Sequence, residues 1–365
     1  MKILKSPSSQ ALLNRILADP GLPEKIKSLD PRELAALIDR VGLEDCGEIV
    51  AFASTQQLEQ MFDQDVWRSA APGADEEFDA ARFGLWIEIL LELGAPAAAK
   101  TIGEMDPDFL TMAFSQLVWV TEFDWLRDQS ASETRLDKIM ESSLSYEIED
   151  FILFSRDPRS WDAVLTLIAE LDSDNHSFMN RILERCAHLS LEQIDDEGGL
   201  WSVLSSEQQI KSDVAYEREK RRETQGFVSP ADARAFLKLA AGPLDMEDHV
   251  SPARFRDHVH LMTSTRANGA NEFGRAVSKM ADSRFARVQA ILMGSPTDNS
   301  PHFEELNYLA NVLVSGWEIN GRSPRPGEAV QVVLETCEKG LTSLPGARSF
   351  IEAFRAGWSQ NGFKL

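Results

Sequence analysis

The stretch Ile26-Lys27-Ser28-Leu29-Asp30-Pro31-Arg32-Glu33-Leu34 predicts how this chain folds, because it describes the end of one helix and the start of the next. Asp is favoured at a helix N-cap, where its carboxylate accepts a hydrogen bond from the free N–H groups of the first turn. Pro31 suits the first helical position, since its missing N–H is not needed there and its fixed φ is already helical. The residue before a proline is kept out of the α region, so the preceding helix must end. Glu33 adds a capping-box partner for Asp30.

This pattern of cap residue and proline recurs along the chain. Ile102-Gly103-Glu104-Met105-Asp106-Pro107-Asp108-Phe109-Leu110 repeats the order of apolar residues, Asp and Pro seen in the first stretch. Shorter versions stand at Asp157-Pro158, Ser229-Pro230, Ser251-Pro252 and Ser300-Pro301. Repeated start signals, each followed by helical periodicity, predict an all-α chain. We expect stacked short helices that form a superhelical, repeat-like array, with a further helical C-terminal half.

Helical patterns cover most of the chain, and no run of alternating strand residues stands out. Phe83 to Leu91 places its apolar residues at i, i+3, i+4, i+7 and i+8. Pro107 to Leu126 is predicted as one long aromatic helix, and helical pattern resumes after a polar linker and runs through Phe154. Val330 to Leu334 is the best strand candidate, although it also fits a helix. The tryptophans at helical spacing are interpreted as core residues.

The chain of 365 residues carries a formal net charge of -22. Such a surface repels nucleic-acid phosphates and anionic membranes, so neither a nucleic-acid role nor membrane insertion is expected. It favours solubility, and it suits divalent cations or a basic protein partner. With 43% hydrophobic residues, the chain can still bury a sizeable core.

The cysteines Cys46, Cys186 and Cys337 are far apart and form no CxxC pair, so neither a zinc knuckle nor a disulfide framework is predicted. We expect buried free thiols in a reducing compartment. The first residues, Met1 to Pro7, lack the apolar core of a signal peptide, and no stretch is apolar enough to span a bilayer. The sequence therefore predicts a soluble cytoplasmic protein.

Several stretches together resemble a bacterial family of uncharacterised proteins that is known only as a domain of unknown function. They are Val41 to Asp45, Arg221-Arg222, Gly226 to Pro230, Glu305 to Leu313 and Phe354 to Trp358. The resemblance covers nearly the whole chain. It implies a helical fold and no particular activity.

The first part of the chain also resembles the superhelical N-terminal domain of MgtE-type magnesium transporters, which stacks short helices joined by Leu-x-Pro or Asp-Pro turns. The chain lacks the nucleotide-sensing and membrane domains of that transporter. We expect an MgtE-N-like helical array over residues 1–128, a middle helical region over 129–241 and a C-terminal helical region over 242–365, or one continuous unit.

Six acidic residues form the candidate metal site, because carboxylate oxygens are the ligands that Ca²⁺ and Mg²⁺ take in proteins. They are Asp63, Asp65, Asp75, Glu76, Glu77 and Asp79. The residues after Asp65 offer no third ligand and no turn glycine of the kind an EF-hand needs. An acidic loop leading into a helix N-terminus is the alternative interpretation. No cofactor is assigned from the sequence, and Mg²⁺ or Ca²⁺ is the one candidate.

Two other groups are weaker candidates. Asp172-Ser173-Asp174-Asn175-His176 begins like a calcium loop, but Ser177 and Leu183 stand where glycine and glutamate are needed. We interpret Asp174 as a helix cap instead. His258 and His260, near His249, are two residues apart and therefore point in different directions on a helix. They are interpreted as exposed polar histidines.

The basic run Arg218, Lys220, Arg221 and Arg222 alternates with glutamates, and a charged helix face is favoured over a phosphate site. No phosphate loop, GxSxG elbow or HExxH motif is present, so no catalytic residue is assigned. The leading hypothesis is a non-enzymatic protein-interaction or scaffold module with a protein partner, because helical arrays form extended binding surfaces. A divalent-cation-responsive regulatory protein is the alternative, and an enzyme of unrecognised type is the third.

Overall fold

The computed structural model contains two compact units, and each has its own hydrophobic core. It describes residues 13–14, 16–69, 76–92, 94–123, 143–195, 205–224, 227–242, 288, 300–319, 323–324 and 326–359. The first unit comprises Met1–Arg68 and Phe78–Arg218, and the second comprises Ser69–Glu77 and Glu219–Leu365. The fold is mostly helical, as predicted. The three regions expected from the sequence stay a prediction.

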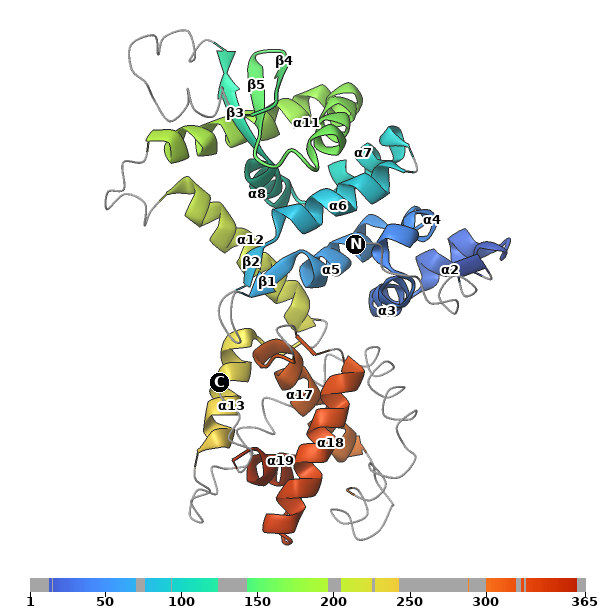
Figure 1. Ribbon diagram of the computed structural model, residues 1–365, viewed down its shortest axis with the longest axis vertical. Coiled ribbons are helices and arrows are strands. Elements are labelled where there is room, and N and C mark those ends of the chain that lie inside the picture. Colours follow the sequence, from blue (N-terminus) through green and yellow to red (C-terminus); the bar gives the residue numbers. More distant parts are fainter. Residues whose placement is uncertain are drawn as a thin grey trace. The chain divides into compact units, whose positions relative to one another are not determined.

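Short helices begin the first unit, and a small sheet and a long helix follow them (Figure 1). The helices are α2 (Leu22–Ser28), α3 (Pro31–Val41), the 3₁₀ helix η1 (Leu43–Asp45), α4 (Gly47–Val50), α5 (Thr55–Asp65), α6 (Ala80–Leu91), α7 (Ala95–Gly103), α8 (Pro107–Leu117) and α11 (Trp161–Asp195). The strands β1 (Trp67–Ser69) and β2 (Glu76–Phe78) pair with each other. The strands β3 (Val118–Glu122), β4 (Ser145–Ile148) and β5 (Phe151–Ser155) form an antiparallel sheet in the order β3-β5-β4. Helix α12 (Ser206–Thr224) begins in the first unit and ends in the second.

Helix starts follow the local signals in the sequence. At α5 a capping box is present, because Gln57 N donates to Ser54 Oγ over 3.2 Å and Ser54 N donates to Gln57 Oε1 over 2.8 Å. Asp106 caps α8 by accepting from the N–H groups of Asp108 and Phe109. Such caps satisfy N–H groups that the helix itself leaves without partners.

The sheet corrects the expected helices over Pro107 to Leu126 and up to Phe154. Helix α8 ends at Leu117, and the chain continues as β3. In the sheet, Trp119 lies opposite Phe154 and Val120 lies opposite Leu153. The residues of β3 pair with residues about thirty or more positions away, and side chains on both faces of the strand are buried. The stabilisation from these long-range contacts outweighs the helical spacing of the residues. Val330 to Leu334, the best strand candidate, lies within a helix.

Aromatic side chains hold the centre of the first core. Phe62 contacts Phe83 and Trp86 edge to face, with ring centroids 5.5 and 5.2 Å apart, and Phe83 contacts Phe109 at 5.6 Å. Helix α11 packs against α6, α7, α8 and β3, so it covers the helices and the sheet together. Trp86, Trp119, Trp161 and Trp358 are buried, which confirms their interpretation as core residues. Of the other two tryptophans interpreted in this way, Trp317 is partly buried against the second core and Trp125 lies outside the described residues.

The second unit is mostly helical in its described residues. Its helices are α13 (Pro230–Ala241), α17 (Ser300–Gly316), α18 (Pro326–Ser343) and α19 (Phe350–Trp358). Helices α18 and α19 approach each other closely at two glycines. A side chain at Gly357 would overlap the carbonyl of Thr336, and one at Gly340 would overlap the carbonyl of Ala353. The lack of a Cβ at these positions is therefore what lets the two backbones meet.

The cysteines Cys46, Cys186 and Cys337 are buried free thiols, as predicted. Burial raises the pKa of Cys46 and of Cys186 to about 12, so both thiols stay protonated at neutral pH. Among the helices of the described ranges, none combines the length and the apolarity needed to cross a bilayer.

The packing of α18 on α19 predicts opposite effects for the same substitution at two glycines of these helices. Gly357→Ala should lower the free energy of unfolding by about 1–3 kcal/mol, because the added methyl group overpacks the contact with Thr336. Gly327→Ala, in the first turn of α18, meets no atom within 4 Å and should raise it by about 0.5–1 kcal/mol, because alanine favours the helix. Urea unfolding of both variants measures the difference. Equal stability of the two would contradict the close approach.

Candidate functional site

The turn between β4 and β5 holds a non-glycine residue with a positive φ, a conformation that no other non-glycine residue takes in the described part of the chain. Only Glu149 and Asp150 connect the two strands, which makes a two-residue hairpin loop. Glu149 has φ 50°, in the left-handed region that favours Gly or Asn in such loops. A glutamate in this region is held there by its surroundings at some energetic cost, and such residues concentrate at functional sites.

Two large apolar side chains, one on β4 and one just before it, are exposed to solvent. Side chains alternate along a strand, and Tyr146 lies opposite the buried Leu153. Leu144 and Tyr146 therefore share the face that packs on the core, yet they are 51% and 46% exposed. Phe123, just after β3, is 43% exposed and donates its N–H to the carbonyl of Asp150 over 2.8 Å. The hairpin thus carries an exposed apolar edge.

An acidic cavity of about 520 Å³ opens beside this hairpin. The sheet and its turn supply Glu122, Phe123, Glu147, Glu149, Asp150 and Phe151, and α11 supplies Asn180 and Glu184. Five of these eight residues are carboxylates, and no basic residue lines the cavity in the described part of the chain. Glu184 Oε1 accepts a hydrogen bond from Asn180 Nδ2 over 2.8 Å. Such a cavity favours cationic groups.

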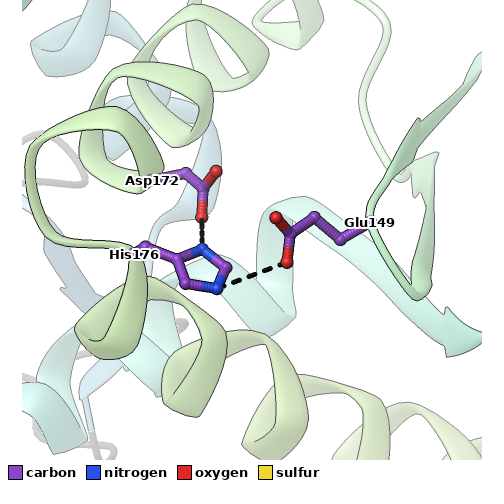
Figure 2. A group of neighbouring side chains, drawn as sticks. All are labelled: Glu149, Asp172 and His176. Atoms are coloured by element: carbon purple, nitrogen blue, oxygen red, sulfur yellow. Dashed lines mark hydrogen bonds and ion pairs between the residues drawn. The ribbon is translucent and has the colours of Figure 1, made fainter.

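Glu149, Asp172 and His176 form a group next to the cavity (Figure 2). His176 lies between the two carboxylates, with Nδ1 2.8 Å from Asp172 Oδ1 and Nε2 3.3 Å from Glu149 Oε2. The hydrogen bond to Asp172 and the negative charge of Glu149 raise the pKa of His176. In the described ranges, this is the group whose His, Cys, Asp or Glu ligand atoms lie close enough together to hold a metal ion.

A kink in α11 places Asp172 and His176 toward the hairpin. Asn175 has φ -146° and ψ 74°, so the helix is interrupted there. Asn175 Oδ1 then accepts from Phe178 N over 3.2 Å and caps the second half of the helix. Asn175, and not Asp174 as expected from the sequence, is therefore the cap, because its side chain is the one that reaches the first turn after the kink.

The acidic residues singled out in the sequence have other partners in the structure. Asp65 accepts from Arg82 Nε over 2.7 Å and from Trp86 Nε1 over 2.6 Å. Asp79 caps α6 through Arg82 N and pairs with Arg68 at 2.6 Å. Both carboxylates therefore balance cations of the same chain.

The remaining members of that set are spread over different surroundings. Asp63 is buried, and its backbone carbonyl accepts from Arg218 Nε over 2.7 Å. Glu76 pairs with Arg222 at 2.8 Å, Glu77 is exposed on β2, and Asp75 lies outside the described residues. The described members do not meet in one group of ligand atoms. Binding of Mg²⁺ or Ca²⁺ by this set stays a prediction.

The basic run, which the sequence suggested as a charged helix face, is divided: Lys220 is exposed and Arg221 is half-buried, whereas Arg218 and Arg222 are buried. Arg218 lies over the ring of Trp67, 4.6 Å from its centroid, and Arg222 lies 5.3 Å from the ring centroid of Phe227. Their planar cations are stabilised by aromatic faces and by the acceptors already named. His249, His258 and His260 lie outside the described residues.

A second cavity of about 470 Å³ lies between α8, α11 and α12, and it bears on the enzyme hypothesis. His188 Nε2 is 3.4 Å from Ser206 Oγ and 3.3 Å from Glu192 Oε1. In a catalytic serine site the carboxylate holds Nδ1 and leaves Nε2 for the serine, whereas here both contacts meet at Nε2. Glu192 also accepts from Ser206 N over 2.9 Å, so the group joins α11 to the start of α12.

The role of Asp65 in the core predicts that its replacement destabilises the fold. Asp65→Ala should lower the free energy of unfolding by about 1–3 kcal/mol, because it leaves the indole N–H of the buried Trp86 without its acceptor. Asp108→Ala is the matched control, since it removes an exposed pair with Arg185 and should cost less than about 1 kcal/mol. Thermal unfolding of both variants measures the difference. A smaller loss for Asp65→Ala than for Asp108→Ala would contradict this role.

Comparisons with known proteins identify a family and no activity. Neither the curated proteins nor the solved structures contain a match to this chain. The model of the family of unknown function DUF6178 matches residues 1–197, which include the sheet, the acidic cavity and all of α11. Of the stretches that suggested a family of this kind, Val41 to Asp45 lies within the matched part. With more than half of its length matched, the chain belongs to the family of unknown function DUF6178.

Proposed function

We propose that this chain is a protein-interaction module that binds an extended, basic segment of a partner protein along strand β4. The observation that carries the proposal is the combination, on the one hairpin, of a strand edge that pairs with no other described strand, exposed apolar side chains and an acidic cavity. Peptides that add a strand to a sheet gain affinity from backbone hydrogen bonds and specificity from side-chain pockets. The hairpin offers both.

The backbone of β4 is suited to strand addition. Ser155 N donates to the carbonyl of Leu144 over 2.8 Å, so Leu144 bonds to β5. In an antiparallel ladder, residues that bond to the neighbouring strand alternate with residues whose N–H and C=O point away. Ser145 and Glu147 therefore direct their backbone groups to the other edge of β4. Within the described residues, no strand pairs with that edge.

Charge and apolar contact favour a basic partner with apolar residues between its cations. Leu144 and Tyr146 offer apolar surface, and the cavity, which Glu147 of β4 helps to line, offers five carboxylates to the cationic side chains of a partner. The net charge of -22 speeds the approach of such a segment at low ionic strength. The charge pattern of the chain, its exposed strand and its cavity thus select the same class of partner.

The proposal predicts that a proline at Ser145 weakens binding without breaking the ladder to β5. Ser145→Pro removes an outward N–H and should weaken the binding of a short peptide of alternating lysine and valine about tenfold, because one acceptor of the peptide loses its donor. Ser145→Ala keeps the N–H and should bind as the original chain does. Fluorescence anisotropy of the labelled peptide measures both.

Two results would overturn the proposal. One is equal binding of the lysine–valine peptide and a glutamate–valine peptide, which would remove the role of charge. The other is unchanged binding by Ser145→Pro, with circular dichroism showing an intact fold, which would remove strand addition.

A response to Mg²⁺ or Ca²⁺ is the second candidate, in line with the proposed likeness of residues 1–128 to the MgtE domain. The acidic cavity favours it, because carboxylate and amide oxygens are the ligands of both ions. This candidate predicts a saturable rise in the unfolding temperature at millimolar Mg²⁺ or Ca²⁺ that sodium chloride of equal ionic strength does not produce. A ligand at a hundredfold excess over its dissociation constant adds about 2.7 kcal/mol. A flat titration with both ions would remove this candidate.

A further inference from the structure

Glu149 and His176 face each other from two elements that are far apart in the sequence. Glu149 stands in the turn between β4 and β5, and His176 begins the second half of α11 just after its kink. Figure 2 shows the carboxylate of Glu149 directed at one nitrogen of the imidazole and the carboxylate of Asp172 directed at the other. The sheet and the helix thus bring an imidazole nitrogen and a carboxylate oxygen together at the surface.

The geometry points to a metal site: we propose that Glu149 Oε2 and His176 Nε2 bind a divalent transition-metal ion of the zinc class. Bonds from zinc to nitrogen and to carboxylate oxygen are about 2.0–2.2 Å long. Two such bonds that meet at about 105° hold their ligand atoms about 3.3 Å apart. The two atoms lie 3.3 Å apart in the structure. An ion can therefore enter without movement of the backbone.

The two sides of the imidazole are spaced differently. Nδ1 lies 2.8 Å from Asp172 Oδ1, a normal distance for a direct hydrogen bond. Nε2 lies 3.3 Å from Glu149 Oε2, which is longer than the usual range of N–H···O bonds. The first contact fits a donor and its acceptor, and the second has a length that an ion pair and two ligands of one ion share.

Asp172 has the position of the carboxylate that orients a metal-binding histidine. Such a histidine almost always donates its second ring N–H to a carboxylate, a backbone carbonyl or water, and this bond fixes the tautomer. With its proton on Nδ1 toward Asp172, His176 presents the lone pair of Nε2 toward Glu149. Asp172 therefore serves as a positioning residue, and Glu149 and His176 are the ligands of the ion.

The ligand set and its exposure select the class of ion. Imidazole nitrogen suits zinc and its neighbours, whereas Mg²⁺ and Ca²⁺ prefer oxygen ligands alone. The side chains of His176 and Glu149 are 54% and 53% exposed, so water can fill the remaining coordination positions. Glu149 has a left-handed φ at a turn where glycine would cost less.

A histidine elsewhere in the first unit provides a matched control. His188 Nε2 also lies 3.3 Å from a carboxylate oxygen, that of Glu192. Glu192 is already occupied as the acceptor for the backbone and hydroxyl of Ser206. The side chain of His188 is 67% exposed. In the described ranges, its ion pair with Glu192 is not part of any group of three ligand residues.

The experiment is titration of the full chain with zinc chloride, followed by isothermal calorimetry, and with cobalt chloride, followed by visible absorption. The acidic surface binds some ions weakly, so the readout is the difference between variants. His176→Gln and Glu149→Gly should each bind one ion fewer than the original chain and lose the cobalt spectrum of a nitrogen-containing site. Asp172→Asn should weaken this ion about 10- to 100-fold, because the orienting bond is lost. His188→Gln should bind as the original chain does.

Glu149→Gly removes the ligand without introducing strain into the turn, so a loss of metal binding in this variant cannot be ascribed to misfolding. Glycine suits the φ of 50°, so this variant removes the ligand while it relaxes the turn, and its unfolding temperature without metal should not fall. If the original chain, His176→Gln and Glu149→Gly bind the same number of ions with the same affinity, the proposal is wrong. The same holds if His188→Gln alone loses an ion.

Discussion

The interruption of α11 at Asn175 is the constraint on which the first unit depends. An apolar stripe runs along the helix through Ile168 and Leu171 and continues at Met179 and Ile182, all of which are buried. An unbroken helix would carry this stripe through position 175. Burying an amide there without partners would cost about 1–3 kcal/mol. The helix breaks instead, and the amide caps the next turn. Both halves then keep their apolar faces on the core, while the kink exposes residues 173–177 beside the hairpin.

The features that could be predicted from the sequence are the ones that neighbouring residues decide. Asp106 caps a helix as expected, because a cap needs only a side chain and an N–H two or three residues away. Ser54 caps α5 in the same local way, and Gly42 stands directly after α3 with φ 106°. The strands could not be predicted in this way. Trp119 belongs to a strand because Phe154 lies opposite it. The residues around Trp119 give no sign that its partner lies so much further along the sequence.

The positions of the charged residues in the fold also could not be predicted from their positions in the sequence. The dense acidic set at 63–79 drew attention in the sequence, yet Asp65 and Glu76 are paired with Arg82 and Arg222, which come from other elements. The acidic cavity takes its carboxylates from positions 122 to 184, where they are too sparse along the chain to attract notice. Density along the sequence therefore differs from density in space, because folding neutralises some carboxylates and gathers others. The positive φ of Glu149 left no trace in the sequence, since nothing in the letters distinguishes a strained glutamate from a relaxed one.

Glu149 connects the two proposals for this chain, because it lines the acidic cavity and also faces His176. A divalent ion on these two residues would place two positive charges on the wall of the cavity. The ion would then repel the cationic side chains of a segment bound along β4, and the segment would repel the ion. Coupling between two binding equilibria is reciprocal, so each ligand must weaken the other by the same factor. The exposure of the site leaves this coupling open to screening by salt. On these grounds the hairpin would work as an exchange point, where either a metal ion or a basic segment balances the carboxylates that the fold has brought together.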